Sequence, residues 1–150
     1  MSMMLSACQT HSTLQPFTSD GCSMFPDRAL SQEIDWCSCC LAHDLAYWQG
    51  GSAQERMKAD RELAECVTAA AHGSALAGIM LAGVRVGGHA SLPTSYRWGY
   101  GWPYGRLYRP LSTHEQSQAN SLRAAYLATN PGLACPGPGA GTLLQTVTHW

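Results

Sequence analysis

The sequence predicts a mostly α-helical, disulfide-stapled domain built on two antiparallel helices. Two helical segments, one containing a histidine and an aspartate and the other acidic, are separated by a short link at Gly50-Gly51. Seven cysteines in 150 residues are typical of proteins that fold in an oxidising compartment. A chain of this length suits one domain and buries a usable core.

The first helix is expected over about residues 35–48, because glycine at Gly50-Gly51 readily adopts the left-handed conformation that ends a helix. The second begins at Ser52-Ala53-Gln54-Glu55, a capping box in which serine and glutamate satisfy free backbone N–H groups. It runs through Val67 or on to Ala71. The short glycine link makes the two helices antiparallel neighbours.

Two more helices are expected further along the chain. The apolar stretch 69–86 is interrupted by glycines and polar residues, so it falls short of the roughly 20 apolar residues of a membrane span. It predicts a buried, closely packed helix over residues 75–84 instead. A second capping box, Ser112-Thr113-His114-Glu115, opens a helix that ends near residue 129.

Between these helices lies a segment rich in glycine, proline and aromatic residues. Five aromatics alternate with other residues, namely Tyr96, Trp98, Tyr100, Trp102 and Tyr104. If the segment is extended, this period of two places them on one side. They either pack in the core and loops or form a lipid-facing rim, since Trp and Tyr favour membrane interfaces.

The composition excludes some partners. Charged residues are 13% of the chain and the formal net charge is −1. Basic residues neither cluster nor exceed the acidic ones, so we expect no nucleic-acid binding. Contact with a phospholipid membrane surface would have to use apolar and aromatic groups, and the sequence does not tell whether the chain has a protein partner.

The N-terminus contains Leu5-Ser6-Ala7-Cys8, which resembles a bacterial lipoprotein processing site whose cysteine carries lipid. The alternative is a chance match in an unstructured N-terminus. We expect residues 1–17 to form a lipoprotein-like tail and residues 18–150 to form the single domain. The expected location is extracytoplasmic: in the bacterial periplasm, in the outer membrane as a lipoprotein, or secreted.

Four residues of the two central helices carry the chemistry. His43 and Tyr47 are four residues apart and share a helix face, and Asp44 lies about 100° round from His43. Asp60 comes from the neighbouring helix, where it can accept the imidazole N–H and leave the other nitrogen free as a base. Tyr47 can donate to Asp60 and hold it in place. The alternative for Asp60 is an ion pair with an arginine one turn away, Arg56 or Arg61.

Asp44 and Asp20 together predict a metal site. Carboxylates, backbone carbonyls and waters suit Ca²⁺ rather than Zn²⁺, and a dication there would stabilise a developing oxyanion. Two alternatives remain open. Asp20-Gly21 is also a common turn dipeptide, and Cys37, Cys40 and His43 have the spacing of a zinc site.

Cys39-Cys40-Leu41-Ala42-His43-Asp44, followed by Asp60 and Cys66, resembles the secreted phospholipase A2 superfamily. Ser19-Asp20-Gly21-Cys22-Ser23, closed by Pro26-Asp27, resembles its bacterial and fungal branch more than the venom or pancreatic enzymes. The resemblance covers roughly residues 18–67.

This resemblance implies a phospholipase A2-like fold and calcium-dependent hydrolysis of a phospholipid acyl ester. It implies that His43 activates the water, that Asp60 orients His43, and that Tyr47 supports Asp60. The implied metal ligands are the side chains of Asp44 and Asp20 and the carbonyl of Gly21, with the N–H near Ser23 assisting the oxyanion. A non-catalytic envelope module that binds lipid or protein on the same scaffold is the alternative function.

The resemblance also implies two disulfides, Cys22–Cys40 and Cys39–Cys66. Cys37 and Cys135 are then left to pair with each other. That pairing would use every cysteine except Cys8 and agrees with a lipid-carrying role for it.

Overall fold

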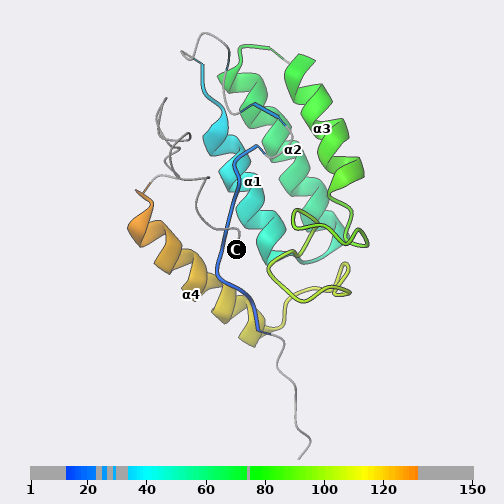
Figure 1. Ribbon diagram of the computed structural model, residues 1–150, viewed down its shortest axis with the longest axis vertical. Coiled ribbons are helices and arrows are strands. Elements are labelled where there is room, and N and C mark those ends of the chain that lie inside the picture. The colour runs from blue at the N-terminus through cyan, green and yellow to red at the C-terminus, as the bar shows by residue number, and fades with distance from the viewer. Residues whose placement is uncertain (1–12, 23–24, 27–28, 30–33, 74, 132–150) are drawn as a thin grey trace, which may run out of the picture.

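The computed structural model describes residues 13–22, 25–26, 29, 34–73 and 75–131, and the regular structure in this part of the chain is helical. The helices are α1 (Cys37–Gln49), α2 (Ala53–Ala70), α3 (Ala75–Gly87) and α4 (Thr113–Thr129). Figure 1 shows α1, α2 and α3 side by side, with α1 and α2 antiparallel, and α4 beyond the N-terminal segment. The predicted mostly helical, disulfide-stapled domain is confirmed.

The helix boundaries follow local signals in the sequence. α1 begins at Cys37 rather than at Asp35. The Asp35 side chain precedes the helix, and its Oδ1 accepts the N–H of the first helical residue, Cys37, at 2.8 Å. It ends before Gly50, whose φ of 68° is left-handed. Both predicted capping boxes are present, at Ser52 and Ser112. α3 continues past the expected end at residue 84.

Two disulfides fix α1 to its neighbours. Cys22–Cys40 joins the N-terminal loop to α1, and Cys39–Cys66 joins α1 to α2. Both expected pairings are therefore confirmed. They bring the loop that carries Asp20 close to the helix that carries His43.

Cys37 is also disulfide-bonded, whereas its expected partner Cys135 lies outside the described residues, as does Cys8. A zinc site needs thiolates. Since Cys37 and Cys40 are both oxidised, the alternative zinc site with His43 is wrong.

The prediction that α3 is a buried helix is wrong. Among its residues Ala77 and Met80 are buried, whereas Ile79 is 61% and Val86 77% exposed. Because α3 packs mainly against α2, its neighbours cover one stripe of the helix. None of the helices in the described ranges is long and apolar enough to cross a lipid bilayer.

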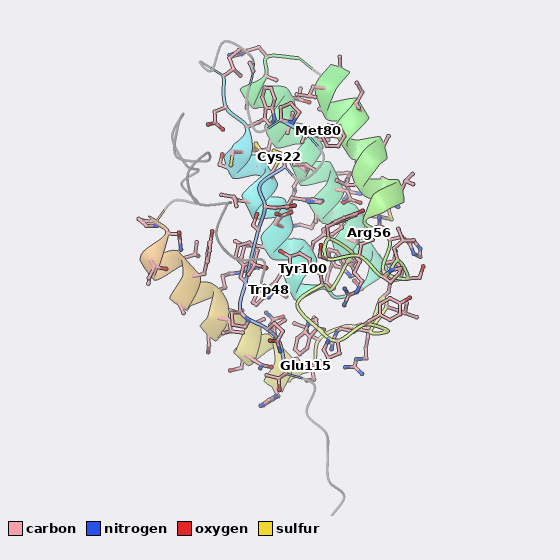
Figure 2. The ribbon with its side chains drawn as sticks, viewed as in Figure 1. Cys22, Trp48, Arg56, Met80, Tyr100 and Glu115 are labelled. Atoms are coloured by element: carbon pink, nitrogen blue, oxygen red, sulfur yellow. A yellow bond between two sulfur atoms is a disulfide. The ribbon has the colours of Figure 1, made fainter. Side chains whose placement is uncertain are left out.

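The core has two main parts. One lies among α1, α2 and α3 and includes Cys22, Val67 and Met80. The other lies between α1, the N-terminal segment and α4 and includes Leu14 and Trp48, as the labelled side chains of Figure 2 help to locate. Leu14, which the expected division assigns to the tail of residues 1–17, is therefore part of the packed domain.

The aromatic segment is a succession of turns rather than an extended strand. Trp98 and Trp102 are buried, whereas Tyr96 and Tyr104 are 41% and 59% exposed. The placement of the five aromatics on one side required an extended segment, and the turns, which reorient the chain every few residues, do not meet that condition. Core and loop packing is thus the main role of the two tryptophans.

Three indole N–H groups hold the end of α1 through backbone carbonyls. Trp98 donates to Gly51 at 2.9 Å, Trp102 to Gln49 at 2.7 Å, and Trp48 to Gln15 at 2.7 Å. The turn after α1 is therefore fixed by residues distant in the sequence.

Arg106 connects the aromatic segment to α4. Its guanidinium lies 4.2 Å from the Trp102 ring centroid and donates to both carboxylate oxygens of Glu115, at 2.8 and 2.9 Å. The hydrogen bonds from Arg106 lower the pKa of Glu115 to about 2, because they stabilise the ionised carboxylate.

Candidate active site

Three of the predicted residues form one buried, hydrogen-bonded group. His43 and Tyr47 lie one turn apart on α1, and Asp60 faces them from α2. Nε2 of His43 is 2.9 Å from Oδ1 of Asp60, and the Tyr47 hydroxyl donates to the same oxygen at 2.7 Å. Asp60 is 1% and Tyr47 2% exposed. Both predicted contacts with Asp60 are confirmed.

Asp60 is held as a carboxylate. Burial alone would raise its pKa, but hydrogen bonds from His43, Tyr47 and Arg85 outweigh it, so the pKa lies below its ordinary value. Because a carboxylate accepts hydrogen bonds, Nε2 of His43 is assigned the proton. Nδ1 is then the nitrogen that can take a proton from water, and it lies 4.0 Å from Oδ1 of Asp44.

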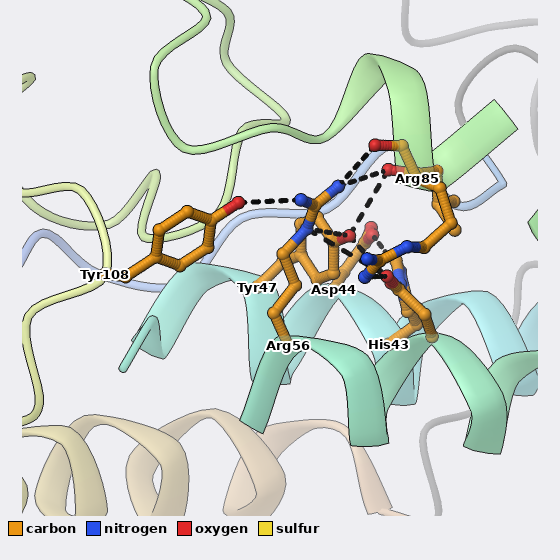
Figure 3. A network of polar contacts seen from close by, with 8 residues as sticks. His43, Asp44, Tyr47, Arg56, Arg85 and Tyr108 are labelled. Atoms are coloured by element: carbon orange, nitrogen blue, oxygen red, sulfur yellow. Dashed lines mark hydrogen bonds and ion pairs between the residues drawn. The ribbon is translucent and has the colours of Figure 1, made fainter. Parts of the chain in front are cut away.

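Two arginines adjoin this group: Arg85 was not predicted to lie at the site, and Arg56 was predicted only as an alternative ion-pair partner of Asp60. Arg85 of α3 donates through Nη1 to Oδ2 of Asp60 at 2.9 Å. Arg56 of α2 donates through Nε to the Tyr47 hydroxyl at 3.0 Å, and Figure 3 shows both arginines around the buried group. The ion pair of Arg56 with Asp60, considered as an alternative, is a 3.9 Å contact. It exists alongside the His43 contact and does not replace it.

A sequence signal for Arg56 exists in α2. Arg56, Asp60, Leu63 and Val67 recur at helical spacing, and all four are buried. An arginine on the buried stripe of a helix needs polar partners. Arg85 has no comparable signal, because it reaches Asp60 across a sequence separation of 25.

An apolar cavity of about 370 Å³ adjoins the group. His43, Asp44 and Tyr47 are among its lining residues, and Asp60 is not. Much of the remaining wall is apolar, formed by residues that include Phe25, Leu63, Met80, Val84 and Val86. A cavity of this chemistry suits an apolar chain.

A second cavity, of about 230 Å³, is lined by Asp44 and Asp20 together with Ser19 and Tyr100. The Ser19 hydroxyl donates to Oδ2 of Asp44 at 2.5 Å. Burial raises the pKa of Tyr100, and the charges of Asp44 and Asp20 raise it further. Both carboxylates therefore act on one hydroxyl, and the structure brings the two predicted metal ligands to one place.

These oxygen donors fit calcium better than softer metals. Within the described residues, no three His, Cys, Asp or Glu side chains are grouped as metal ligands. A cation would therefore depend on Asp20, Asp44 and backbone or water oxygens. Gly21, the predicted carbonyl ligand, lines the apolar cavity rather than the polar one. Ser23, predicted to assist the oxyanion, lies outside the described residues.

The arrangement is a histidine hydrogen-bonded to a buried carboxylate, beside one apolar and one polar cavity. It has the parts needed to deprotonate a water molecule next to a bound apolar group. No protein-family model matches the chain, and no curated protein or solved structure matches it.

Proposed function

We propose that the protein hydrolyses an acyl ester of a phospholipid, using calcium and a water activated by His43. One observation carries the proposal: Asp60 holds one ring nitrogen of His43, while the other lies beside Asp44 where the two cavities adjoin. The apolar cavity suits the acyl chain of a phospholipid, and the polar cavity suits its charged headgroup. The resemblance of residues 18–67 to the secreted phospholipase A2 superfamily supports the same function.

In the proposed reaction, Nδ1 of His43 takes a proton from water as the water oxygen attacks the ester carbonyl carbon. Asp60 stabilises the imidazolium that forms, and His43 then gives the proton to the leaving alcohol. Tyr47 keeps the Asp60 carboxylate turned toward His43. Each group acts from a position where its hydrogen bonds already hold it.

Water is the proposed nucleophile, so no acyl-enzyme forms. The cysteines on the apolar cavity wall, Cys22 and Cys40, are joined in a disulfide. None of the described residues lining that cavity is a serine or threonine. A covalent route through a serine, threonine or cysteine of this cavity would need a free hydroxyl or thiol beside the base.

Asp44 and Asp20 are the side chains proposed to hold the calcium ion. When bound, calcium polarises the ester carbonyl and stabilises the charge that develops on its oxygen. The Ser19 hydroxyl, which donates to Oδ2 of Asp44, competes with a cation for that oxygen.

The proposed partner is a phospholipid membrane surface. Val86 and Tyr96 line the apolar cavity and are 77% and 41% exposed, and Ile79 of α3 is 61% exposed. With a net charge of −1, binding would rest on these apolar groups, so added salt should change vesicle binding little. The disulfides are compatible with an extracytoplasmic location.

Fatty-acid release from mixed phospholipid vesicles tests the proposal, with calcium and then with a chelator. We expect release that depends on calcium and falls roughly 10²–10⁴-fold in His43→Gln. His114→Gln, at an exposed position of α4, is the matched control. Full activity in His43→Gln would refute the base. Vesicle binding without any release would favour the non-catalytic module.

A further inference from the structure

Arg56 is a buried arginine whose hydrogen bonds join three parts of the chain. It is 3% exposed. Its Nε donates to the Tyr47 hydroxyl at 3.0 Å, and Nη1 donates to the Tyr108 hydroxyl at 2.7 Å. Nη2 donates to the carbonyls of Val84 and Arg85, at 2.9 and 2.8 Å. Figure 3 shows Arg56 extending from α2 between Tyr108 and the end of α3.

These contacts determine where the Tyr47 proton points. A guanidinium has only donors, so Arg56 uses the Tyr47 oxygen as an acceptor. The single hydroxyl proton is then directed to another acceptor. Asp60 Oδ1 at 2.7 Å is closer than the Val84 carbonyl at 3.4 Å. Arg56 thus fixes Tyr47 as a donor to the oxygen that faces His43.

Arg85 holds the other side of the same carboxylate. His43 and Tyr47 contact Oδ1 of Asp60, and Arg85 contacts Oδ2 at 2.9 Å. A buried carboxylate without a balancing charge is costly and tends to take up a proton. The backbone carbonyl of Arg85 in turn accepts from Arg56, so one arginine helps to place the other.

We infer that Arg85 and Arg56 are positioning residues for the base. Arg85 balances the charge of Asp60 and aims its carboxylate at His43, and Arg56 holds Tyr47 and the backbone of Arg85. The predicted effect of these arginines on kcat rests on the proposed hydrolysis. Their predicted effect on the protonation of Asp60 does not, and it can be measured without a substrate.

Kinetics of Arg85→Gln provide the first test. We expect kcat to fall about tenfold or more with KM little changed, a smaller loss than removal of a general base gives. Arg85→Lys should recover part of kcat, because it restores the charge without the planar guanidinium. Arg61→Gln removes the same charge from an exposed site on α2 and should behave as wild type. Equal kcat in Arg85→Gln and wild type would overturn the role of Arg85.

Tyr108→Phe tests Arg56 without removing a buried arginine. It deletes the hydroxyl that accepts from Nη1 of Arg56, so kcat should fall, but by a smaller factor than in Arg85→Gln. An unchanged kcat in this variant would remove Arg56 from the inference.

Carboxyl NMR gives the second test and needs no substrate. The chain has five aspartates, Asp20, Asp27, Asp35, Asp44 and Asp60, and Asp60→Asn identifies the resonance of interest under ¹³C-aspartate labelling. Among the residues that the structure describes, the charged or titratable groups facing Asp60 are His43 and Tyr47 from α1, Arg56 from α2, and Arg85 from α3.

In the wild type, Asp60 should stay ionised at pH values where ordinary aspartates take up a proton. In Arg85→Gln it should titrate at higher pH. An identical titration in both proteins would overturn the inference. If the wild type hydrolyses no phospholipid, the proposed function fails while this titration still decides the role of Arg85.

Discussion

Replacing Asp60 with asparagine tests how the proposed base is held. The two side chains are nearly the same size, but the amide has one oxygen acceptor and one NH₂ donor. In the protein, one carboxylate oxygen accepts from His43 and Tyr47, and the other accepts from Arg85. Asparagine therefore cannot satisfy both sides.

Either orientation of the amide damages the base. If its oxygen faces Arg85, its NH₂ faces Nε2 of His43, so Nε2 must accept and the ring proton moves to Nδ1. If its oxygen faces His43, its NH₂ meets Nη1 of Arg85. That arginine can turn to solvent, since its side chain is 42% exposed, but the imidazolium then lacks its counter-charge.

The structure sets different sizes for the catalytic and stability effects. Loss of the correct tautomer or of the counter-charge should lower kcat at least about 10²-fold, within the range for general base catalysis. Stability should fall by about 1.5–3 kcal/mol or more, because asparagine is uncharged and leaves at least one of the three contacts of Asp60 unmade in each orientation. Fatty-acid release and thermal unfolding measure the two effects. A variant that keeps more than about a tenth of the wild-type rate would refute this account of the base.

Three further predictions concern the metal, the packing and the pH dependence. Asp44→Asn should weaken calcium binding in calorimetric titration and lower activity with it, and unchanged binding would place the site elsewhere. A Cβ at Gly88 would lie 2.9 Å from the Tyr47 hydroxyl, so Gly88→Ala should cost about 1–3 kcal/mol and reduce kcat. A Cβ at Gly101 would meet other core side chains, so Gly101→Ala should lower the melting temperature and leave kcat unchanged. An equal loss of kcat in both glycine variants would contradict this prediction. The pKa of Glu115 in the folded protein is about 2, below its ordinary value of 4.5. The stability that its ionised carboxylate contributes is therefore fully present above pH 4.5 and is lost as the pH falls toward 2. Unfolding scans should show less loss of stability over that window in Glu115→Gln.

Local signals in the sequence predict the helices well. Two capping boxes mark the starts of α2 and α4, and glycine marks the end of α1. The contacts of His43 and Tyr47 with Asp60 were also predictable, because helical spacing and a short link bring these residues together. Each of these features depends on residues close in sequence or on one helix–helix contact.

The features that could not be predicted depend on distant contacts. Arg85 meets Asp60, and Tyr108 meets Arg56, and neither pair has a repeating pattern. Hydropathy alone did not show that α3 leaves Val86 exposed, since exposure depends on how many neighbours cover a helix. The period of two in the aromatic segment failed for a related reason: its tryptophans bond to carbonyls near the end of α1 rather than to a neighbouring strand.

The turn between α1 and α2 has a consequence for protein engineering. Links between helices usually accept inserted residues because they lie on the surface. Here Gly50 and Gly51 are buried, and Trp98, which donates to Gly51, packs edge-on against Tyr47 with ring centroids 5.0 Å apart. A tag or loop grafted into this turn would displace Trp98 and, through it, the group around Asp60. Between α2 and α3, His72 and Gly73 are exposed, so this position is the safer graft site, and chains of common descent should vary in length there while keeping the length of the first turn.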